Sequence, residues 1–225
     1  MNPDLIIRAN NVARTFGTGP AAIVAVHDVT CDVHAGQQIA LTGPSGSGKT
    51  TLLHLFAGLD TPTTGTVEWP ALGGIRELRP GPVAVVFQAP SLLPALDVVE
   101  NVALPLLLQG TNRTTARSAA MVALERLDLA NLASKLPEEL SGGQAQRVAI
   151  ARVLAGQPRL ILADEPTGQL DHLNGSHVID ALIAAATELG AALIINTHDH
   201  NVAGRLPIRW SMTRGRLTQK ATLSC

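Results

Sequence analysis

A glycine-rich stretch is the part of this sequence whose residue types most clearly suggest chemistry. In order, its residues are Gly43, Pro44, Ser45, Gly46, Ser47, Gly48, Lys49 and Thr50. They fit the pattern G-x-x-x-x-G-K-[ST], in which glycines let backbone N–H groups curl around phosphate oxygens. Lys49 would supply charge to the outer phosphates, and the Thr50 hydroxyl could bind Mg²⁺. A flexible glycine turn is the weaker interpretation, because a strand precedes the loop and a helix follows it. We therefore predict binding of a nucleoside triphosphate.

Two adjacent acids, Asp164 and Glu165, follow the apolar run 160–163. In phosphate-loop enzymes, an Asp at the end of such a strand holds Mg²⁺ directly or through water. Glu165 would then be placed to orient and deprotonate an attacking water. The alternative, a capping pair before a helix, weakens once a phosphate loop is present in the same chain. We assign Asp164 to the metal and Glu165 to catalysis.

A second candidate anion site is Ser141-Gly142-Gly143-Gln144, which precedes another predicted helix. A serine and two glycines there would leave backbone N–H groups free at the positive end of the helix. A flexible turn followed by a helix N-cap explains Ser-Gly-Gly equally well. The sequence thus raises the question of why one chain would need two phosphate-binding loops.

The elements that must position these residues alternate between strand and helix. Apolar runs predict buried strands of a parallel sheet over 37–43, 83–87, 160–163 and 192–196. Helical periodicity covers 50–58, 98–129 with a break at Gly110, 141–155 and 176–189. Runs over 5–12 and 23–33 predict a small antiparallel sheet, whereas 61–82 is rich in turn residues. The pattern is that of an α/β fold with an inserted helical subdomain.

Composition narrows the classes of protein further. The chain of 225 residues has 17 Lys and Arg against 18 Asp and Glu, which argues against a nucleic-acid binder held by phosphate neutralisation. With 46% hydrophobic residues, disorder is not expected. The two cysteines, Cys31 and Cys225, make no disulfide framework and indicate a reducing, intracellular context. We expect neither a signal peptide nor a membrane-spanning helix.

Taken together, the motifs resemble those of the ATP-binding subunits of ABC transporters. LSGGQ stands at 140–144, and the similarity extends over nearly the whole chain. The runs 43–60, 92–108 and 162–171 are most similar to the branch that serves lipoprotein-release, macrolide-export and cell-division systems. The implied fold is a single ABC ATPase domain over 1–225, with a phosphate-loop NTPase core of mainly parallel sheet, an N-terminal antiparallel β subdomain and a helical subdomain.

The resemblance implies boundaries for these parts and roles for further residues. The core would comprise about 1–87 and 156–225, and the helical subdomain about 88–155. Phe16 stands where the family places an aromatic that stacks on adenine, in place of the more usual Tyr. Gln88 matches the loop that senses Mg²⁺ and meets the membrane partner, and His198 matches the histidine that contacts the outer phosphate.

Three other segments bear on the resemblance. The run 168–171 resembles the loop through which two subunits signal to each other, with Gln169 where the branch usually has Asn. Residues 215–217 resemble the closing strand motif of the family. The segment 69–83 is short and rich in Gly and Pro where close relatives have a helical stretch, so its local structure stays open.

The residue sets implied by the resemblance are as follows. The nucleotide-binding set is Phe16, Gly43, Pro44, Ser45, Gly46, Ser47, Gly48, Lys49, Thr50, Thr51, Ser141, Gly142, Gly143 and Gln144. The catalytic set is Glu165, His198, Lys49 and Gln88, and the metal set is Thr50, Gln88 and Asp164. The expected cofactors are ATP and Mg²⁺.

The resemblance also implies partners. ATP bound on the 43–51 loop of one subunit would be covered by Ser141–Gln144 of a second in a head-to-tail dimer, which would explain the two loops. Hydrolysis would separate the subunits and drive an integral membrane permease, in export or extraction. We expect a homodimer with two working sites, no nucleic-acid partner, and a cytoplasmic protein held peripherally at the inner face of the cell membrane by its permease.

Two other functions fit the sequence less well. An ABC-type ATPase without a membrane partner, as in DNA repair or translation, usually carries a coiled-coil insertion, a second ATPase domain or a basic surface, and none is visible. A phosphate-loop kinase or switch would not need LSGGQ or His198. His172, His177 and His200 lie near acids without metal-ligand spacing, which favours solvated surface. The segment 92–94 could face the coupling helix of a partner or pack in the core, with equal weight.

Overall fold

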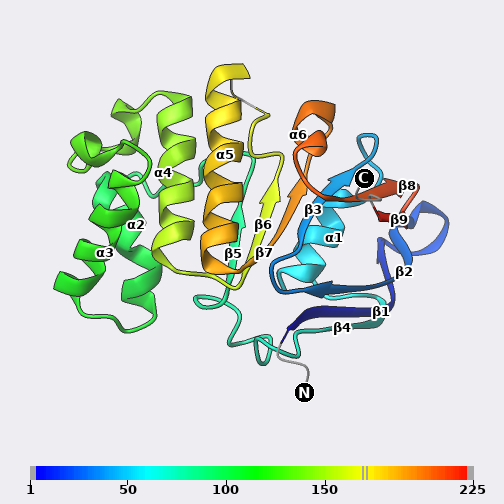
Figure 1. The fold of residues 1–225 in the computed structure, drawn as a ribbon. Coiled ribbons are helices and arrows are strands. Elements are labelled where there is room, and N and C mark those ends of the chain that lie inside the picture. The colour runs from blue at the N-terminus through cyan, green and yellow to red at the C-terminus, as the bar shows by residue number, and fades with distance from the viewer. Residues whose placement is uncertain (1–3, 169, 171, 222–225) are drawn as a thin grey trace.

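The computed structural model describes residues 4–168, 170 and 172–221, and Figure 1 shows their arrangement. Helices α2, α3 and α4 lie together at one side, and α5 lies between them and the strands (Figure 1). The helices are α1 (Lys49–Phe56), α2 (Val98–Leu108), α3 (Arg113–Glu125), α4 (Gly142–Ala155), α5 (His172–Leu189) and α6 (His200–Gly204). Short 3-10 segments cover Gly19–Ala21, Ala130–Leu132 and Pro137–Glu139.

The larger sheet has the strand order β5-β6-β7-β3-β8-β9. Its strands are β3 (Gln38–Thr42), β5 (Val83–Val86), β6 (Leu160–Asp164), β7 (Ala192–Asn196), β8 (Ile208–Thr213) and β9 (Arg216–Ala221). All neighbouring pairs are parallel except β8 and β9, which form an antiparallel hairpin. The predicted α/β fold with a mainly parallel sheet is therefore confirmed. Because the parallel strands end at one edge, the loops that follow β3, β6 and β7 lie close together.

The smaller sheet is antiparallel, as predicted, but has one strand more than the sequence indicated. Its order is β2-β1-β4, with β1 (Leu5–Phe16), β2 (Ile23–His34) and β4 (Thr64–Glu68). The prediction that turns break up the chain throughout 61–82 is wrong over β4. Gly65 has a φ of +79°, and a Cβ there would lie 2.3 Å from the Asn11 carbonyl oxygen. Glycine in this strand therefore permits a close approach to β1 rather than a turn.

The hydrophobic core is divided by the larger sheet. On β6, Ile161 and Ala163 belong to a cluster with the helices α2 to α5, whereas Leu160 and Leu162 belong to a cluster with α1 and the antiparallel sheet. All four side chains are fully buried. Burial on both faces explains why these strands are continuous apolar runs rather than alternating ones.

Within the segment 69–83, the residues before β5 form turns and bends and not a helix. The Trp69 indole Nε1 donates to the Phe56 carbonyl oxygen at 2.8 Å, and the Arg79 guanidinium donates to the Gly58 carbonyl oxygen at 3.1 Å. Leu78 is fully buried. These contacts fix the segment against the end of α1 without any periodic structure of its own.

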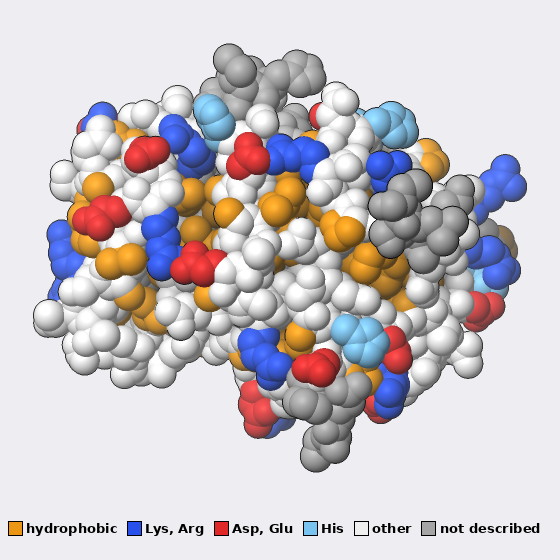
Figure 2. Space-filling view, in the orientation of Figure 1, with side chains coloured by type: hydrophobic (Ala, Val, Ile, Leu, Met, Phe, Trp, Pro, Cys, Tyr) orange, Lys and Arg blue, Asp and Glu red, His pale blue; other side chains and the backbone are white. Residues whose placement is uncertain are grey.

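On the face shown in Figure 2, Lys and Arg side chains are interspersed with Asp and Glu. The near-equal numbers of basic and acidic residues in the sequence therefore do not separate into a basic and an acidic region on this face. Within the described part of the chain, no helix combines the length and the apolar character needed to cross a membrane.

A candidate nucleotide-binding site

The glycine-rich loop joins β3, the strand between β7 and β8, to the start of α1. Gly48, the residue before α1, has a φ of +98°. A Cβ at this position would lie 1.9 Å from the Ala25 carbonyl oxygen on β2. Glycine is therefore required here both by conformation and by space. The antiparallel sheet is therefore in direct contact with the loop at this point.

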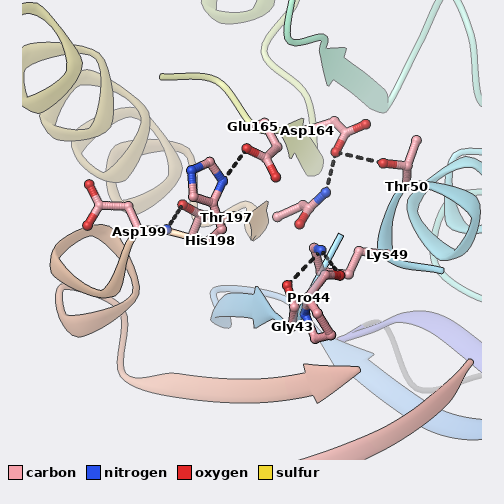
Figure 3. Close-up of polar contacts among 10 residues, drawn as sticks. Gly43, Pro44, Lys49, Thr50, Asp164, Glu165, Thr197, His198 and Asp199 are labelled. Atoms are coloured by element: carbon pink, nitrogen blue, oxygen red, sulfur yellow. Dashed lines mark hydrogen bonds and ion pairs between the residues drawn. The ribbon is translucent and has the colours of Figure 1, made fainter. Parts of the chain in front are cut away.

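Lys49 and Thr50 open α1 and point back toward the loop and the sheet (Figure 3). The Lys49 Nζ donates to the carbonyl oxygens of Gly43 and Pro44, both at 2.9 Å, and the residue is 6% exposed. The Thr50 Oγ1 donates to the Asp164 Oδ1 at 3.2 Å. The structure thus brings together the lysine, the hydroxyl and the acid that the sequence assigned to phosphate and metal.

Glu165 and His198 meet at the same edge of the sheet (Figure 3). The His198 Nδ1 lies 2.6 Å from the Glu165 Oε2. Glu165 has a φ of +47°, and its N–H donates to the Asn196 carbonyl oxygen at 3.0 Å. A left-handed glutamate is uncommon, so the backbone of β7 holds Glu165 in a position that a free loop would rarely adopt. The two predicted catalytic side chains are therefore in contact.

A cavity of about 730 Å³ contains most of the predicted site. It is lined by Ile23, Val24, Ala25, Ser45, Gly46, Ser47, Gly48, Lys49, Thr50, Thr51, Gln88, Asp164, Glu165, Asn196 and His198. Gln88 comes from the end of β5, and a Cβ on Gly168 would lie 3.1 Å from its Nε2. Residues from opposite ends of the sequence thus share one cavity.

Phe16 lies beside this cavity and is not among its described lining residues. It pairs with Ile23, which does line the cavity, in the register of β1 and β2. The Phe16 side chain is exposed, and the Arg14 guanidinium carbon lies 4.6 Å from the ring centroid. One face of the ring is therefore covered by a cation, in a cation–π contact.

The second predicted anion loop lies at the start of α4 and lines no part of the described cavity. Ser141 is the N-cap: its Oγ accepts from the Gln144 N–H at 3.3 Å, and the Gln144 Oε1 accepts from the Ser141 N–H at 2.9 Å. This reciprocal capping box confirms the predicted helix start. Ser141 and Gly142 are exposed, so this helix end is open to solvent rather than part of the cavity wall.

The sequence profile of the ABC transporter family matches residues 26–168. The chain belongs to the ABC transporter family. It is 40% identical to the lipoprotein-releasing system ATP-binding protein LolD of Shewanella denitrificans, over 96% of both chains. It is 38% identical to LolD of Pseudomonas syringae pv. tomato, over 97% of this chain and all of that protein. The predicted resemblance to the lipoprotein-release branch is confirmed.

Solved structures of ABC cassettes have the same fold. A dimeric bacterial ABC transporter cassette has a TM-score of 0.85 at 36% identity, covering 95% of this chain and 98% of that chain. Its post-hydrolysis state with ADP and Pi has a TM-score of 0.84 at 35% identity and the same coverage. As a member of this family, the chain is an ATP-binding and ATP-hydrolysing subunit of a membrane transporter or extraction complex, and the predicted activity is confirmed.

The residues of this ABC ATPase site fit a nucleotide with Mg²⁺. The Ser47 Oγ is buried in the loop and, in the part of the chain that the structure describes, has no hydrogen-bond partner. A phosphate oxygen would satisfy its hydroxyl. The hydroxyl of Thr50, the carboxylate of Asp164 and the amide of Gln88 line one cavity, and oxygen ligands of this kind suit Mg²⁺.

The backbone on both sides of Gln88 is hydrogen-bonded to α4. The Gln146 Nε2 donates to the Phe87 carbonyl oxygen at 3.1 Å. Arg152 donates to the carbonyl oxygens of Pro90 and Ser91 and to the Ser91 hydroxyl, at 2.9–3.3 Å. Sequence reasoning did not single out Gln146 or Arg152, because their partners are backbone atoms about 60 residues away.

Of the two alternatives for 92–94, packing in the core holds for Leu92, and a contact with a partner stays a prediction. Leu92 is partly buried and packs against the core, whereas Leu93 is exposed. The fully buried Asn101 fixes this segment, because its Oδ1 accepts from the Leu93 N–H at 2.7 Å and its Nδ2 donates to the carbonyl oxygens of Leu93 and Leu96. The exposed Leu93 is therefore presented on a fixed backbone.

The remaining residues discussed from the sequence are the histidines, the two cysteines and Gln169. Among the described residues, no group of three or more His, Cys, Asp or Glu side chains could hold a metal ion. Cys31 is buried, and burial together with the nearby Asp32 raises the pKa of its thiol to about 12. Gln169 and Cys225 lie outside the described residues, as does the side chain of His172.

Proposed function

We propose that this chain binds Mg-ATP in the cavity beside the glycine-rich loop and hydrolyses it within a head-to-tail dimer. The observation that carries the proposal is the convergence of Lys49, the Thr50–Asp164 pair and the Glu165–His198 pair on one cavity. Each pair combines residues from distant parts of the sequence. A loop that merely turned the chain would not need acids and a histidine at its mouth.

In this proposal, the loop and Lys49 bind the phosphates. The backbone N–H groups of 45–51 and the unpartnered Ser47 hydroxyl would hold phosphate oxygens, and Lys49 would offset the charge of the outer phosphates. Thr50, Asp164 and Gln88 would hold Mg²⁺, which when bound neutralises charge on the phosphates. Phe16, at the cavity edge, would stack on the adenine.

Proton transfer falls to Glu165. As a carboxylate it would take one proton from the attacking water while the water oxygen bonds to the outer phosphorus. The bond from that phosphorus to the bridging oxygen would break at the same time, so that ADP leaves with the electron pair and the outer phosphate leaves as Pi. His198, 2.6 Å from this carboxylate, would hold it in position and contact the outer phosphate. The two side chains are in contact before any nucleotide binds, so their mutual position does not depend on the nucleotide.

The dimer follows from where the second loop lies. Ser141 and Gly142 are exposed, and the 141–144 loop is not among the described residues lining its own cavity. We propose that Ser141, Gly142, Gly143 and Gln144 cover the ATP held by a second copy of the chain. Since one chain carries every assigned role, a homodimer would have two working sites.

We further propose a permease as the membrane partner and lipoprotein release as the process. The support is the name of the LolD relatives, which describes a lipoprotein-releasing system. The protein would then act at the cytoplasmic face of the membrane, without a nucleic-acid partner. The segment 88–155 would form a helical subdomain between core segments 1–87 and 156–225, in keeping with the packing of α2, α3 and α4 against one another.

The test uses the variant Glu165→Gln, which should bind ATP without turning it over. With Mg-ATP, size-exclusion chromatography with light scattering should detect a tight dimer, and without nucleotide a monomer. Purification from detergent-solubilised membranes should recover an integral membrane protein alongside it. A monomer at saturating Mg-ATP would contradict the head-to-tail dimer. Recovery of nucleic acid or soluble protein alone would instead favour an ABC ATPase without a membrane partner.

A further inference from the structure

Asn196 is a buried amide in the wall of the cavity that the sequence analysis did not single out. It ends β7, is 1% exposed, and lies opposite Asp164 in the parallel register of β6 and β7. Ile194 and Ile195 before it are fully buried apolar residues. Burying an amide here costs folding free energy unless its nitrogen and oxygen form hydrogen bonds.

The nitrogen of the Asn196 amide is hydrogen-bonded to Asp164. The Asn196 Nδ2 donates to the Asp164 Oδ1, the same oxygen that accepts from the Thr50 Oγ1 at 3.2 Å. A carboxylate can only accept, so the amide must present its nitrogen to Asp164. This contact therefore fixes which side of the Asn196 side chain carries the oxygen.

The second polar atom of the amide, its oxygen, lacks a hydrogen-bond partner among the described residues. The Asn196 Oδ1 is buried and has no hydrogen-bond partner in the part of the chain that the structure describes. An amide oxygen accepts hydrogen bonds or binds cations, and it cannot bond to a phosphate oxygen, which is also an acceptor. A group that completes this site must therefore be a cation or carry a hydrogen-bond donor. Beside Asp164 and Thr50, a water molecule of a hydrated divalent cation meets that requirement.

We propose that Asn196 is a positioning residue of the divalent-cation site, acting in two ways. Its N–H holds Asp164 in the orientation that it shares with Thr50, and its Oδ1 accepts a hydrogen bond from a water bound at the cation. This inference rests on the proposed nucleotide and metal site. It assigns to Asn196 the task of completing that site, since residues that orient metal ligands commonly contribute 10- to 100-fold to metal affinity.

The test measures metal and nucleotide affinity separately, with no turnover. In the presence of the non-hydrolysable analogue AMP-PNP, the affinity of the full-length protein for Mn²⁺ is followed by electron paramagnetic resonance. Binding of AMP-PNP alone is measured in EDTA by calorimetry. We expect Asn196→Leu, which has a similar volume and no polar atoms, to weaken Mn²⁺ binding about 10-fold and to leave AMP-PNP binding in EDTA unchanged.

Two controls keep the outcome interpretable. Asn101→Leu removes another fully buried asparagine, whose hydrogen bonds go to the 93–97 backbone, and should lower the melting temperature without changing Mn²⁺ affinity. If Asn196→Leu does not fold, Asn196→Ser, which is too short to reach Asp164, should show the same 10-fold loss.

The outcomes separate this inference from the proposed function. Mn²⁺ affinity in Asn196→Leu equal to that of the parent protein would overturn the role of Asn196, as would a parallel loss of AMP-PNP affinity in EDTA. Asp164→Asn serves as the reference variant. If it also binds Mn²⁺ as tightly as the parent, the metal site itself has been misassigned and the proposed function fails instead.

Discussion

At the scale of single residues, the site depends on a close backbone contact at Gly48 that leaves no space for a side chain. Gly48 has its α-carbon so close to β2 that any side chain would collide with the Ala25 carbonyl oxygen, 1.9 Å from the Cβ position. That oxygen is a backbone atom of β2, so it cannot move aside as the end of a flexible side chain would. The loop and the antiparallel sheet must therefore keep a fixed distance from each other.

Gly48→Ala should consequently lower kcat/KM for ATP on the order of 100-fold, the size of effect expected when a site is misplaced by about 1 Å. Gly36→Ala is the matched control, because Gly36 has a similar φ of +73° and open space around its Cβ position. It should cost about 1 kcal/mol of folding free energy from backbone conformation alone and leave kcat/KM unchanged. Steady-state ATPase kinetics and thermal melts of both variants check this, and equal effects would contradict it.

Most of the site residues could be predicted from sequence because short motifs determine local geometry. The lysine, the hydroxyl and the two acids stand at fixed distances from a strand end or helix start, so their meeting follows from parallel strands. Asn196 carries no such signal, since a lone amide after apolar residues resembles the end of any strand. Only the structure shows that its nitrogen reaches Asp164 and that its oxygen is left without a described partner.

At the scale of elements, α4 joins two functions that are far apart in the sequence. Its first residues form the exposed capping box. Further along, Gln146 holds the backbone just before Gln88, and Arg152 holds the backbone just after it. Burial lowers the pKa of Arg152, yet an arginine stays charged at neutral pH. A rigid helix should therefore carry movement of the Gln88 segment to the 141–144 loop.

Arg152→Met should release the carbonyl groups of Pro90 and Ser91. The loss of hydrogen bonds from a charged donor predicts a destabilisation of about 2 kcal/mol and faster amide hydrogen exchange over 88–92. Arg126→Met is the control, because the side chain of Arg126 forms an exposed ion pair with Glu188 at 3.0 Å, worth less than about 1 kcal/mol. Unchanged exchange over 88–92 in Arg152→Met would show that α4 does not hold this segment.

Elements with strong periodicity were predictable, and elements that depend on tertiary contacts were not. The apolar strands β3, β5, β6 and β7 match their predicted runs closely. Strand β4 was missed because Gly65 suggests a turn. Strand β8 was missed because polar residues interrupt its apolar ones, and the helix α6 because five residues carry little periodicity. Helix α5 begins at His172, four residues before the predicted start at Ser176.

At the scale of the whole molecule, ligand binding should be visible as added stability. The cavity connects the antiparallel sheet, the larger sheet and α1, so a bound nucleotide would tie parts of both hydrophobic clusters together. At a Mg-ATP concentration 100 times the Kd, linkage adds about 2.7 kcal/mol. For a chain of this size the melting temperature should rise by about 5–10 °C.

The measurement is a thermal melt of Glu165→Gln, so that the nucleotide persists. EDTA should reduce the shift, because metal removal takes away the contribution of Thr50 and Asp164. The further change Lys49→Met should abolish it. A shift that survives Lys49→Met would place the nucleotide somewhere other than the glycine-rich loop.

The separation of the 141–144 loop from the cavity of its own chain has a genetic consequence. In the proposed dimer, a defective Lys49 spoils the site on its own chain, whereas a defective Ser141 spoils the site on the neighbour. When two such alleles are expressed together, a mixed pair joins both defects in one site and leaves the other site intact. Two alleles that are each inactive alone would then complement one another, whereas two alleles damaged in the same loop would not.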